Sequence, residues 1–484
     1  MGLLNRKIIY SFIALMAIST LEACKKDFLE VTPKGVLVAE KVSDYNQLLN
    51  SLSTAVMPNL VSGDEAAGIE PYFTGETLPE NQKSFRWEND IYLPDATSME
   101  WTMIMQMIYQ YNKVINEVMD AKDGSEEQKQ SLMAEARACR AWGYFMMVNF
   151  YGKPYNEATA AADLAVPKVL ISDVSQTKFT RATVKEIYDL VIDDLTASLP
   201  YLPTALTNRL RMSKPAAEGL LGKVYAFMGQ YDKALPQLNA AINDLPGASI
   251  PVGLYDFQKE LAPGGAFTPI SPITGPSRGN LNIDQEVLFL RQTVNYFNFL
   301  FSGVVLNTKA VGLYLPGDYR RAFLTPNPFA DFANVYPNGM LRTWGSGAVN
   351  NVGVSVPDIY LLRAECKSRG NDLAGAVADM EAFRKMRMPA GEAVIPAAIA
   401  ADKVTLTIFI LNERIREFPI QGYRWFDMRR LSVDPVYKST VGTTHTVYDM
   451  NGTVKGTYTL RPERLVFRIP LYIANANPDI PQNP

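Results

Sequence analysis

The feature that most constrains the fold of this chain is a stretch in which small residues recur at helical spacing. It reads AAEGLLGKVYAFMGQYDKALPQLNAAINDLP, residues 216 to 246. Small and large residues alternate along it in a fixed pattern, at Gly222, Tyr225, Gly229, Ala234, Leu238, Ala241 and Pro246. The small residues suit the contact between two antiparallel helices, and the large ones fill the space beside it. One such pair cannot bury its apolar face alone, so other helices must stack on it.

A weaker copy of the same pattern follows later in the chain. It reads YLLRAECKSRGNDLAGAVADMEAFRKMR, residues 360 to 387, with Ala364, Gly370 and Ala376 in register but Lys367 where an aromatic residue is usual. The spacing in both copies resembles that of a tetratricopeptide repeat. We therefore predict a mainly α protein built on a helical-repeat scaffold.

Three further segments have helical periodicity and would complete the stack. They are residues 101–119, 128–151 and 183–199. The last of them begins with a capping box formed by Thr183 and Glu186. The predicted scaffold thus covers residues 101–246 and 356–430.

The remaining sequence is irregular but rich in aromatic residues. Residues 60–98 and 247–350 abound in Gly, Pro, Asn and aromatic side chains, with short strand-like runs. Long irregular segments in a compact domain are usually functional or disordered, and the aromatic content argues against disorder. We expect both segments to form the ligand-binding side of one body, residues 24–484, which ends in a loop-rich tail, residues 431–484.

The N-terminus has the pattern of a secretory signal. A short basic start precedes an apolar run from Ile8 to Ile18, and Leu21 and Ala23 then lead to Cys24. A small residue directly before a cysteine predicts a bacterial lipoprotein signal, residues 1–23, with Cys24 becoming the acylated first residue. The alternatives are an ordinary cleaved signal with an incidental cysteine, or an uncleaved anchor.

Composition excludes several kinds of function. The chain has 47 Lys and Arg residues against 50 Asp and Glu residues, without basic clusters, so no nucleic-acid partner is expected. It contains neither a phosphate-binding glycine loop nor cysteine pairs at metal spacing, so we expect no metal and no cofactor. Cys139 and Cys366 lie in apolar helical patterns and should be buried thiols.

The single histidine gives little support to catalysis. His445 lies in GTTHTVYDMNGTVKG, which predicts a hairpin with its turn at Asn451 and Gly452. We expect the histidine on a solvent-facing strand. Glu413 and Glu417 are one helical turn apart, as a pair of catalytic carboxylates would be. However, arginines surround them, namely Arg414, Arg416, Arg424, Arg429 and Arg430. Carboxylates paired in this way stay ionised, which predicts a structural network rather than acid–base catalysis.

Five motifs in order resemble the SusD/RagB family of surface glycan-binding lipoproteins. They are CKKDFLEVTPKG (24–35), AEARACRAWGYFMMVNFYGKPY (134–155), VPDIYLLRAEC (356–366), LNERIREFPIQGYRWFDMRR (411–430) and NPDIPQNP (477–484). The sequence departs from the family pattern at Pro419 and Gln421, and it stops at Pro484.

The resemblance implies a non-catalytic protein. Members of the family hold an oligosaccharide or polysaccharide nutrient at the surface of the outer membrane, to which lipid anchors them. They deliver it to a SusC-like TonB-dependent transporter, on which they sit as a lid. Two alternatives remain open: a peptide-binding RagB-like uptake lipoprotein, and a helical polysaccharide-degrading enzyme. The enzyme would need two carboxylates facing each other across a cleft.

Candidate ligand residues follow from composition alone. Sugar rings need aromatic platforms with carboxylate, amide or guanidinium groups beside them. In the first irregular segment the candidates are Asp64, Tyr72, Phe73, Arg86, Trp87 and Tyr92, and in the second they are Tyr296, Phe297, Asn298 and Trp344. For each of them, a core or loop-anchoring role is the alternative.

Overall fold

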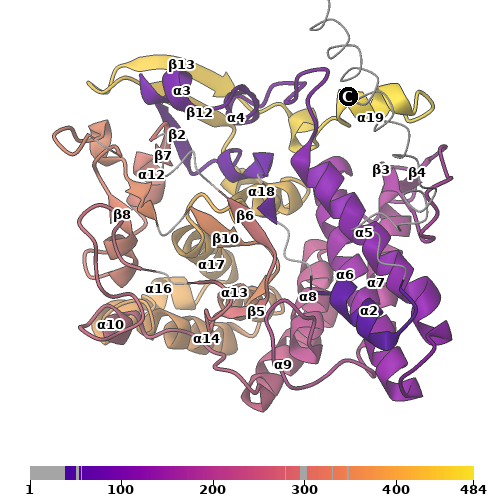
Figure 1. Ribbon diagram of the computed structural model, residues 1–484. Coiled ribbons are helices and arrows are strands. Elements are labelled where there is room, and N and C mark those ends of the chain that lie inside the picture. The colour runs from indigo at the N-terminus through magenta and orange to yellow at the C-terminus, as the bar shows by residue number, and fades with distance from the viewer. Residues whose placement is uncertain are drawn as a thin grey trace, which may run out of the picture.

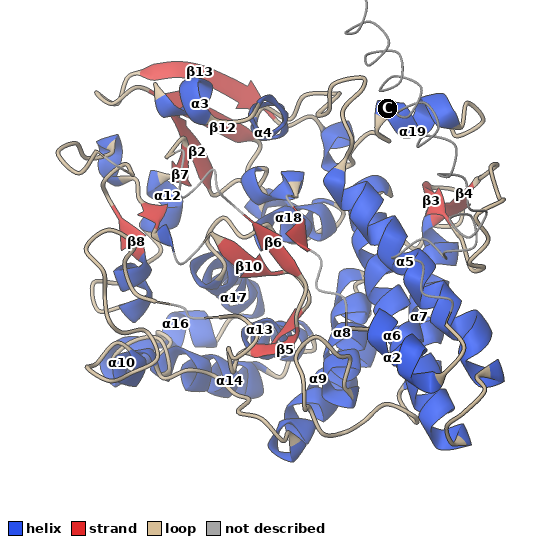
Figure 2. Ribbon diagram, in the orientation of Figure 1, coloured by secondary structure: helices blue, strands red, loops and turns tan. Residues whose placement is uncertain are grey.

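The computed structural model describes residues 39–50, 54–55, 57–277, 280–294, 302–329, 331–345 and 348–484. Helices fill one side of the molecule and its base, and loops with short strands fill the other side (Figures 1 and 2). The main helices are α2 (Val42–Leu48), α5 (Met99–Glu117), α6 (Glu126–Tyr151), α7 (Val184–Ser198), α8 (Lys214–Phe227), α9 (Tyr231–Asp244), α13 (Val356–Arg369), α14 (Leu373–Lys385), α17 (Lys403–Glu417) and α18 (Tyr423–Ser432). The predicted helical scaffold is confirmed. Among the described residues, no helix is both long enough and apolar enough to cross a membrane.

The helices predicted beside the repeat begin and end within two residues of the predicted bounds. Ser125 and Gln128 form a capping box at the start of α6, and Thr183 and Glu186 form the predicted one at α7. Consecutive helices pack as antiparallel pairs, α5 with α6 and α6 with α7. Their shared interior is the main hydrophobic core, in which Cys139 and Cys366 are buried and unpaired, as predicted.

The two repeat copies form neighbouring helix pairs. Helix α8 packs on α9, and α13 packs on α14. At the first contact the small residue is required, since a Cβ atom on Gly222 would lie 2.6 Å from Leu238. Helix α13 also packs directly against α9, so the second copy continues the stack of the first. Residues 247–350 therefore leave the stack and return to it between two adjacent pairs.

Short elements outside the scaffold divide into small helices and small sheets. The helices are α3 (Tyr72–Glu76), α4 (Pro79–Phe85), α10 (Phe257–Glu260), α12 (Thr308–Val311), α15 (Ala390–Ala393), α16 (Ala397–Ala400) and α19 (Leu471–Ala476). The strands are β1 (Thr54–Ala55), β2 (Ala66–Ile69), β3 (Leu164–Pro167), β4 (Arg181–Thr183), β5 (Val287–Phe289), β6 (Gln292–Val294), β7 (Val304–Leu306), β8 (Leu324–Thr325), β9 (Arg342–Thr343), β10 (Val349–Asn351), β11 (Val354–Ser355), β12 (Thr444–Tyr448) and β13 (Val454–Thr459).

One four-stranded sheet joins three distant parts of the chain. Its order is β13, β12, β2, β7. Strand β12 pairs antiparallel with β13 and parallel with β2, and β2 pairs antiparallel with β7. The hairpin of β12 and β13 is the predicted one, and Gly452 in its turn has φ +84°. The sheet thus brings the tail and both irregular segments to one side of the molecule.

The arginine-rich helices form a buried ion-pair network, as predicted. Glu413 accepts hydrogen bonds from Arg320 and Arg384, each at 2.6 Å, and from Arg416. Glu417 is bonded to Arg387 and Arg320. Burial alone would raise the pKa of Glu413, but Arg416, Arg320 and Arg384 outweigh burial and hold that pKa well below its usual range. The carboxylate therefore stays ionised and cannot act as a general acid.

Replacing Glu413 by Gln should lower the free energy of unfolding by about 3–5 kcal/mol, because three buried arginines lose their counter-charge. Urea denaturation followed by circular dichroism measures this loss. The control is Glu463→Gln, since Glu463 pairs with Arg461 at an exposed site, and it should cost less than about 1 kcal/mol. Equal losses in the two variants would contradict the role given to the network.

Candidate functional site

The two irregular segments meet where α3 faces a loop of the second segment. Helix α3 follows β2 closely, and Tyr72 at its start donates a hydrogen bond from its hydroxyl to Asp331 Oδ2 at 3.0 Å. Asp331 belongs to the loop between β8 and β9. Tyr72, one of the predicted site residues, thus connects the first irregular segment to the second.

The loop around Asp331 is held by its own side chains, and we call its described residues, 327–329 and 331–335, the platform loop. Asn327 Nδ2 donates to the carbonyl oxygens of Phe332 and Asn334, at 3.2 and 2.8 Å. Asn334 Nδ2 donates to Asp331 Oδ2 at 2.8 Å. These bonds fix the backbone on both sides of Phe332, whose side chain is 44% exposed. The loop therefore presents an aromatic ring beside a carboxylate and an amide.

Hydrogen bonds also set the charge of the platform loop. The side chains of Asn334 and Tyr72 donate to Asp331 and lower the pKa of its carboxyl. Hydrogen bonds to a carboxylate favour its charged form. Asp331 is consequently an ionised acceptor at neutral pH, which suits the binding of hydroxyl groups.

Trp344 is connected to the platform loop through Arg342. The Arg342 guanidinium lies 5.6 Å from the centre of the Trp344 ring and 5.9 Å from that of Phe329, and its Nε donates to Asn327 O at 2.8 Å. The Trp344 ring also rests on the turn at Gly275, where a Cβ atom would approach it to 2.2 Å. Trp344 is half-buried. It thus offers part of a ring surface that its neighbours hold in place.

Phe73 and Trp87 lie inside the molecule. Their side chains are 1% and 4% exposed, and they belong to an aromatic stack beneath the four-stranded sheet. In that stack the centre of the Phe85 ring lies 4.9 Å from that of Phe73 and 4.3 Å from that of His445. Trp87 covers the other face of His445 at 3.8 Å. Neither Phe73 nor Trp87 has a ring face to offer to a sugar, because both side chains are buried.

The predicted solvent exposure of His445 is wrong. His445 is completely buried, because Phe85 and Trp87, from the end of α4 and just beyond it, cover its imidazole ring. The predicted hairpin is present, but the face of β12 that carries His445 points inward.

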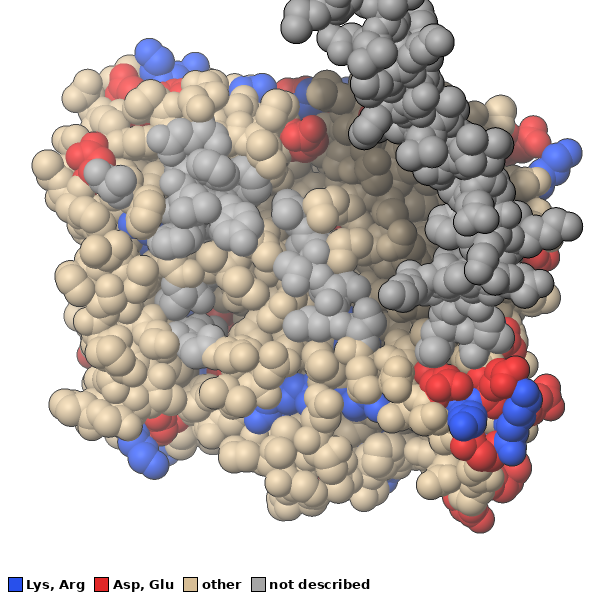
Figure 3. Space-filling model, viewed as in Figure 1, with Lys and Arg blue, Asp and Glu red and all other residues tan. Residues whose placement is uncertain are grey.

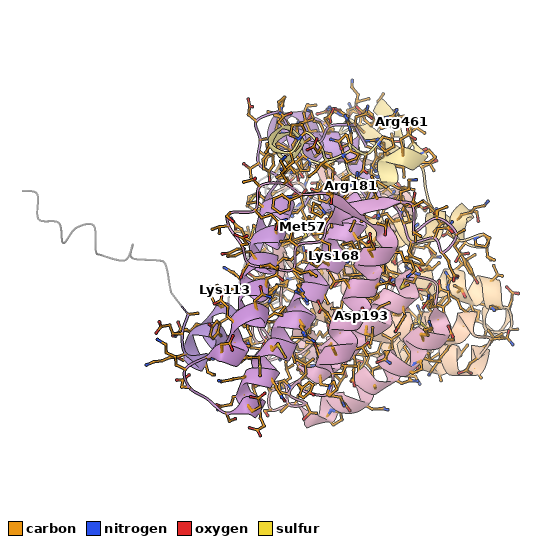
Figure 4. All side chains as sticks on the ribbon, turned by 90° about the vertical axis from the view of Figure 1, so that its right-hand side faces the viewer. Met57, Lys113, Lys168, Arg181, Asp193 and Arg461 are labelled. Atoms are coloured by element: carbon orange, nitrogen blue, oxygen red, sulfur yellow. The ribbon has the colours of Figure 1, made fainter. Side chains whose placement is uncertain are left out.

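Arg86 borders a polar hollow of about 530 Å³. Its guanidinium lies over the rings of Phe73 and Tyr458, at 5.4 and 5.6 Å, and bonds to Gln82 and Glu88. Other polar residues around the hollow are Lys83, Asn89, Asp90 and Arg461. Arg461 lies near the top of the molecule in Figure 4. The hollow supplies donors and acceptors but only the edge of one aromatic residue.

Asp64 and Tyr92 anchor the first irregular segment to helices. The carboxylate of Asp64 is bonded to Arg424 of α18 at 2.6 and 2.8 Å. The hydroxyl of Tyr92 donates to Glu100 of α5 at 2.5 Å. Both polar groups thus have buried partners. Cys24, Tyr296, Phe297 and Asn298 lie outside the described residues, and their roles stay predictions.

A second cavity, of about 750 Å³, lies beside Arg181 and the end of the chain. Figure 4 shows Arg181 on the side of the molecule formed by the helical scaffold. The described residues that line the cavity include no aromatic ring, and many are aliphatic, among them Leu164, Val441, Leu460 and Val466. The cavity therefore lacks the flat platform that a sugar ring requires.

Sequence reasoning missed the platform loop. Asp331, Phe332, Asn334 and Arg342 were not among the predicted residues. The signal was present in NPFADFANVYPNG, residues 327–339, where aromatic, acidic and amide residues stand between two prolines. Charged side chains are sparse over this side in Figure 3 and gather at the far corner, over α2 and the adjoining ends of α5 and α6.

Comparison with known proteins identifies the family. Residues 27–226 match a family model described as "Starch-binding associating with outer membrane", and residues 356–484 match the SusD family model. A SusD-like protein P2 of Formosa agariphila is 24% identical over 251 residues, which are 49% of this chain and 46% of that protein. The chain thus spans less than half the length of this relative.

Solved structures show the same fold. A SusD superfamily protein from Bacteroides vulgatus superposes with a TM-score of 0.69 at 19% identity, covering 92% of this chain and 99% of the other. A SusD-like carbohydrate binding protein from the same organism gives 0.65 at 15% identity, covering 91% and 97%. With two family models matched at the two ends of the chain and this fold between them, the protein belongs to the SusD/RagB family, whose members associate with the outer membrane.

Proposed function

We propose that the protein binds an oligosaccharide on the side formed by α3 and the platform loop, and passes it on without cleaving it. The observation that carries this proposal is the bond between Tyr72 and Asp331. It joins the two irregular segments and places an exposed ring, a carboxylate and amides on one fixed surface. The receiver would be a SusC-like TonB-dependent transporter, as the family resemblance implies.

The chemistry of this surface suits a sugar. The faces of a sugar ring are apolar and stack on aromatic rings, while the hydroxyl rim needs acceptors and donors. Phe332 and Trp344 supply ring surface, and Asp331 and Asn334 supply the polar groups. The family description mentions starch, and one structural relative is described as carbohydrate binding, which favours a sugar over a peptide.

The proposal that the protein is not an enzyme rests on the state of two carboxylates, one at the proposed surface and one in the helical scaffold. A glycoside hydrolase needs a protonated carboxyl group facing a second carboxylate across the bond that is cut. At the proposed surface, hydrogen bonds keep Asp331 ionised. In the helical scaffold, Glu413 is surrounded by arginines that keep it ionised and buried. Neither group has the properties of a general acid.

Attachment to the membrane is assigned to Cys24. Two or three acyl chains each contribute about 0.8 kcal/mol per buried methylene, which makes anchoring stable. The protein would then stay near a transporter without any contact of its own with the lipid interior.

Phe332→Ala and Trp344→Ala should each weaken binding of the preferred oligosaccharide about tenfold, because each removes stacking surface. Titration calorimetry of the soluble form beginning after Cys24, against a panel of plant, fungal and host oligosaccharides, measures this change. Each mixture is then checked for cleavage products. Tyr201→Ala is the control, because Tyr201 is 50% exposed but follows α7 in the scaffold.

The outcomes of this titration separate the alternatives. A panel without saturable heat would make peptides the next ligands to test. Cleavage products would show that the protein is an enzyme and would contradict the proposal that it only binds the oligosaccharide. Equal losses of affinity in all three variants would show that the binding site does not lie at α3 and the platform loop.

Tyr72→Phe should weaken the same binding by about twofold to tenfold, because it removes one hydrogen bond that holds Asp331 in place. Calorimetry with the oligosaccharide selected above measures the loss. The matched control is Tyr458→Phe, which keeps its ring beneath Arg86. If Tyr72→Phe binds like the unchanged protein, the bond does not organise the site.

Cys24→Ala should release the protein from the outer-membrane fraction, because no acyl chain can be attached. Immunoblotting of fractionated cells measures the distribution. Substituting one of the buried thiols, Cys139→Ala, should leave it unchanged. A Cys24→Ala protein that still fractionates with the outer membrane would refute lipid anchoring at this residue.

A further inference from the structure

The single histidine of the chain occupies an unusual position between two aromatic rings. The ring centre of Phe85 lies 4.3 Å from that of His445, with an angle of 22° between the planes. The ring of Trp87 lies 3.8 Å away on the other side, at 21°. Both faces of the imidazole are therefore covered by π systems, from the end of α4 and the residue two positions beyond it.

Both ring nitrogens of His445 face backbone oxygens. Nδ1 lies 2.7 Å from Phe85 O, and Nε2 lies 2.8 Å from Gly63 O. A carbonyl oxygen only accepts hydrogen bonds, whereas a neutral imidazole has one N–H donor and one lone pair. Neutral His445 would therefore direct a lone pair at one of the two carbonyl oxygens. An imidazolium has two donors and satisfies both, and its charge is attracted to the two aromatic faces.

Charged groups reach this position from several elements. Asp64 and Glu65 follow Gly63 directly, and Asp64 is bonded to Arg424 of α18. Lys83 and Arg86 come from α4 and its end, and Tyr458 is the register partner of His445 on β13. Glu65 is buried, and its Oε2 has no hydrogen-bond partner among the described residues. Asp64 is therefore the anionic group that acts on His445.

The physical influences on His445 oppose each other. Burial outweighs the carbonyl groups of Phe85 and Gly63 and the charge of Asp64, so the pKa of His445 is lowered from its ordinary value. Burial, with the charge of Asp64, raises the pKa of Glu65 to about 8. His445 therefore takes up its second proton at a lower pH than an exposed histidine would, whereas Glu65 is already neutral there.

We propose that His445 is a positioning residue whose protonation fastens α4 and the loop at Gly63 to strand β12. As an imidazolium it donates to both carbonyl groups. Without its second proton it keeps one of these bonds, and the segment that loses its donor loosens. The effect reaches the proposed site through Phe85, whose ring packs on Phe73 of α3, the residue after Tyr72. The inference holds whatever ligand the protein binds.

The test uses the soluble form beginning after Cys24, labelled with ¹⁵N, in which one histidine gives a single pair of ring-nitrogen signals. Spectra are recorded from about pH 4 to about pH 8, a range extended downward because burial lowers the pKa of His445. We expect both nitrogens to be protonated at the acidic end, with one proton lost as pH rises. Hydrogen exchange of residues 60–98, corrected for the intrinsic pH dependence, should become about tenfold faster through the same transition, since one charge-assisted hydrogen bond is lost.

Two variants separate positioning from simple packing. His445→Gln retains one donor but cannot be charged, so exchange of residues 60–98 should lose its pH dependence. Glu65→Gln should leave the midpoint of the His445 transition nearly unchanged, because burial and Asp64 already keep Glu65 neutral in this range. If His445→Gln does not fold, the titration and hydrogen exchange of the unchanged protein still test the proposal.

Two results would overturn the proposal. One is a His445 ring that stays neutral with a single proton down to the acidic end of the titration. The other is exchange in residues 60–98 that does not follow the transition of the ring.

Discussion

Buried pairs between arginine and carboxylate connect the irregular segments to the helical scaffold. Arg320 comes from the second irregular segment and is bonded to Glu413 and Glu417 of α17. Glu286 of the same segment is bonded to Arg387, just after α14. Asp64 of the first segment is bonded to Arg424 of α18. Loops of this length have few backbone partners of their own. Each buried charge needs its own partner, so these ion pairs hold the irregular segments in one conformation. In energy such pairs roughly balance their own desolvation, so their contribution is to specificity.

The scaffold could be predicted from the sequence because its rules are local. Small residues at helical spacing place a glycine against Leu238, and a capping box marks the start of α7. The Asn-Gly turn at residues 451 and 452 likewise predicted the hairpin that carries His445. Which face of that hairpin is buried depends on α4, far away in the sequence, and no local pattern contains that information.

The candidate site shows the same limit. Tyr72 and Phe73 are adjacent aromatic residues. The hydroxyl of Tyr72 bonds to the platform loop, whereas the ring of Phe73 lies in the core. Aromatic content pointed to the irregular segments, but within them it could not separate exposed rings from buried ones. Phe332 was missed for the same reason, since only the hydrogen bonds of Asn327 and Asn334 show that its loop is held in place.

The direct contact between α9 and α13 has a consequence for how such a protein can change. Residues 247–350 follow α9, and the chain then returns to the scaffold at α13, which packs directly against α9. Strands β5 and β11 pair near its return, so the exit and entry points are set by the scaffold. Insertions, deletions and exchanges within residues 247–350 leave the register of the repeat untouched. Selection can thus alter the surface that this segment forms, while the helices beneath it keep their sequence.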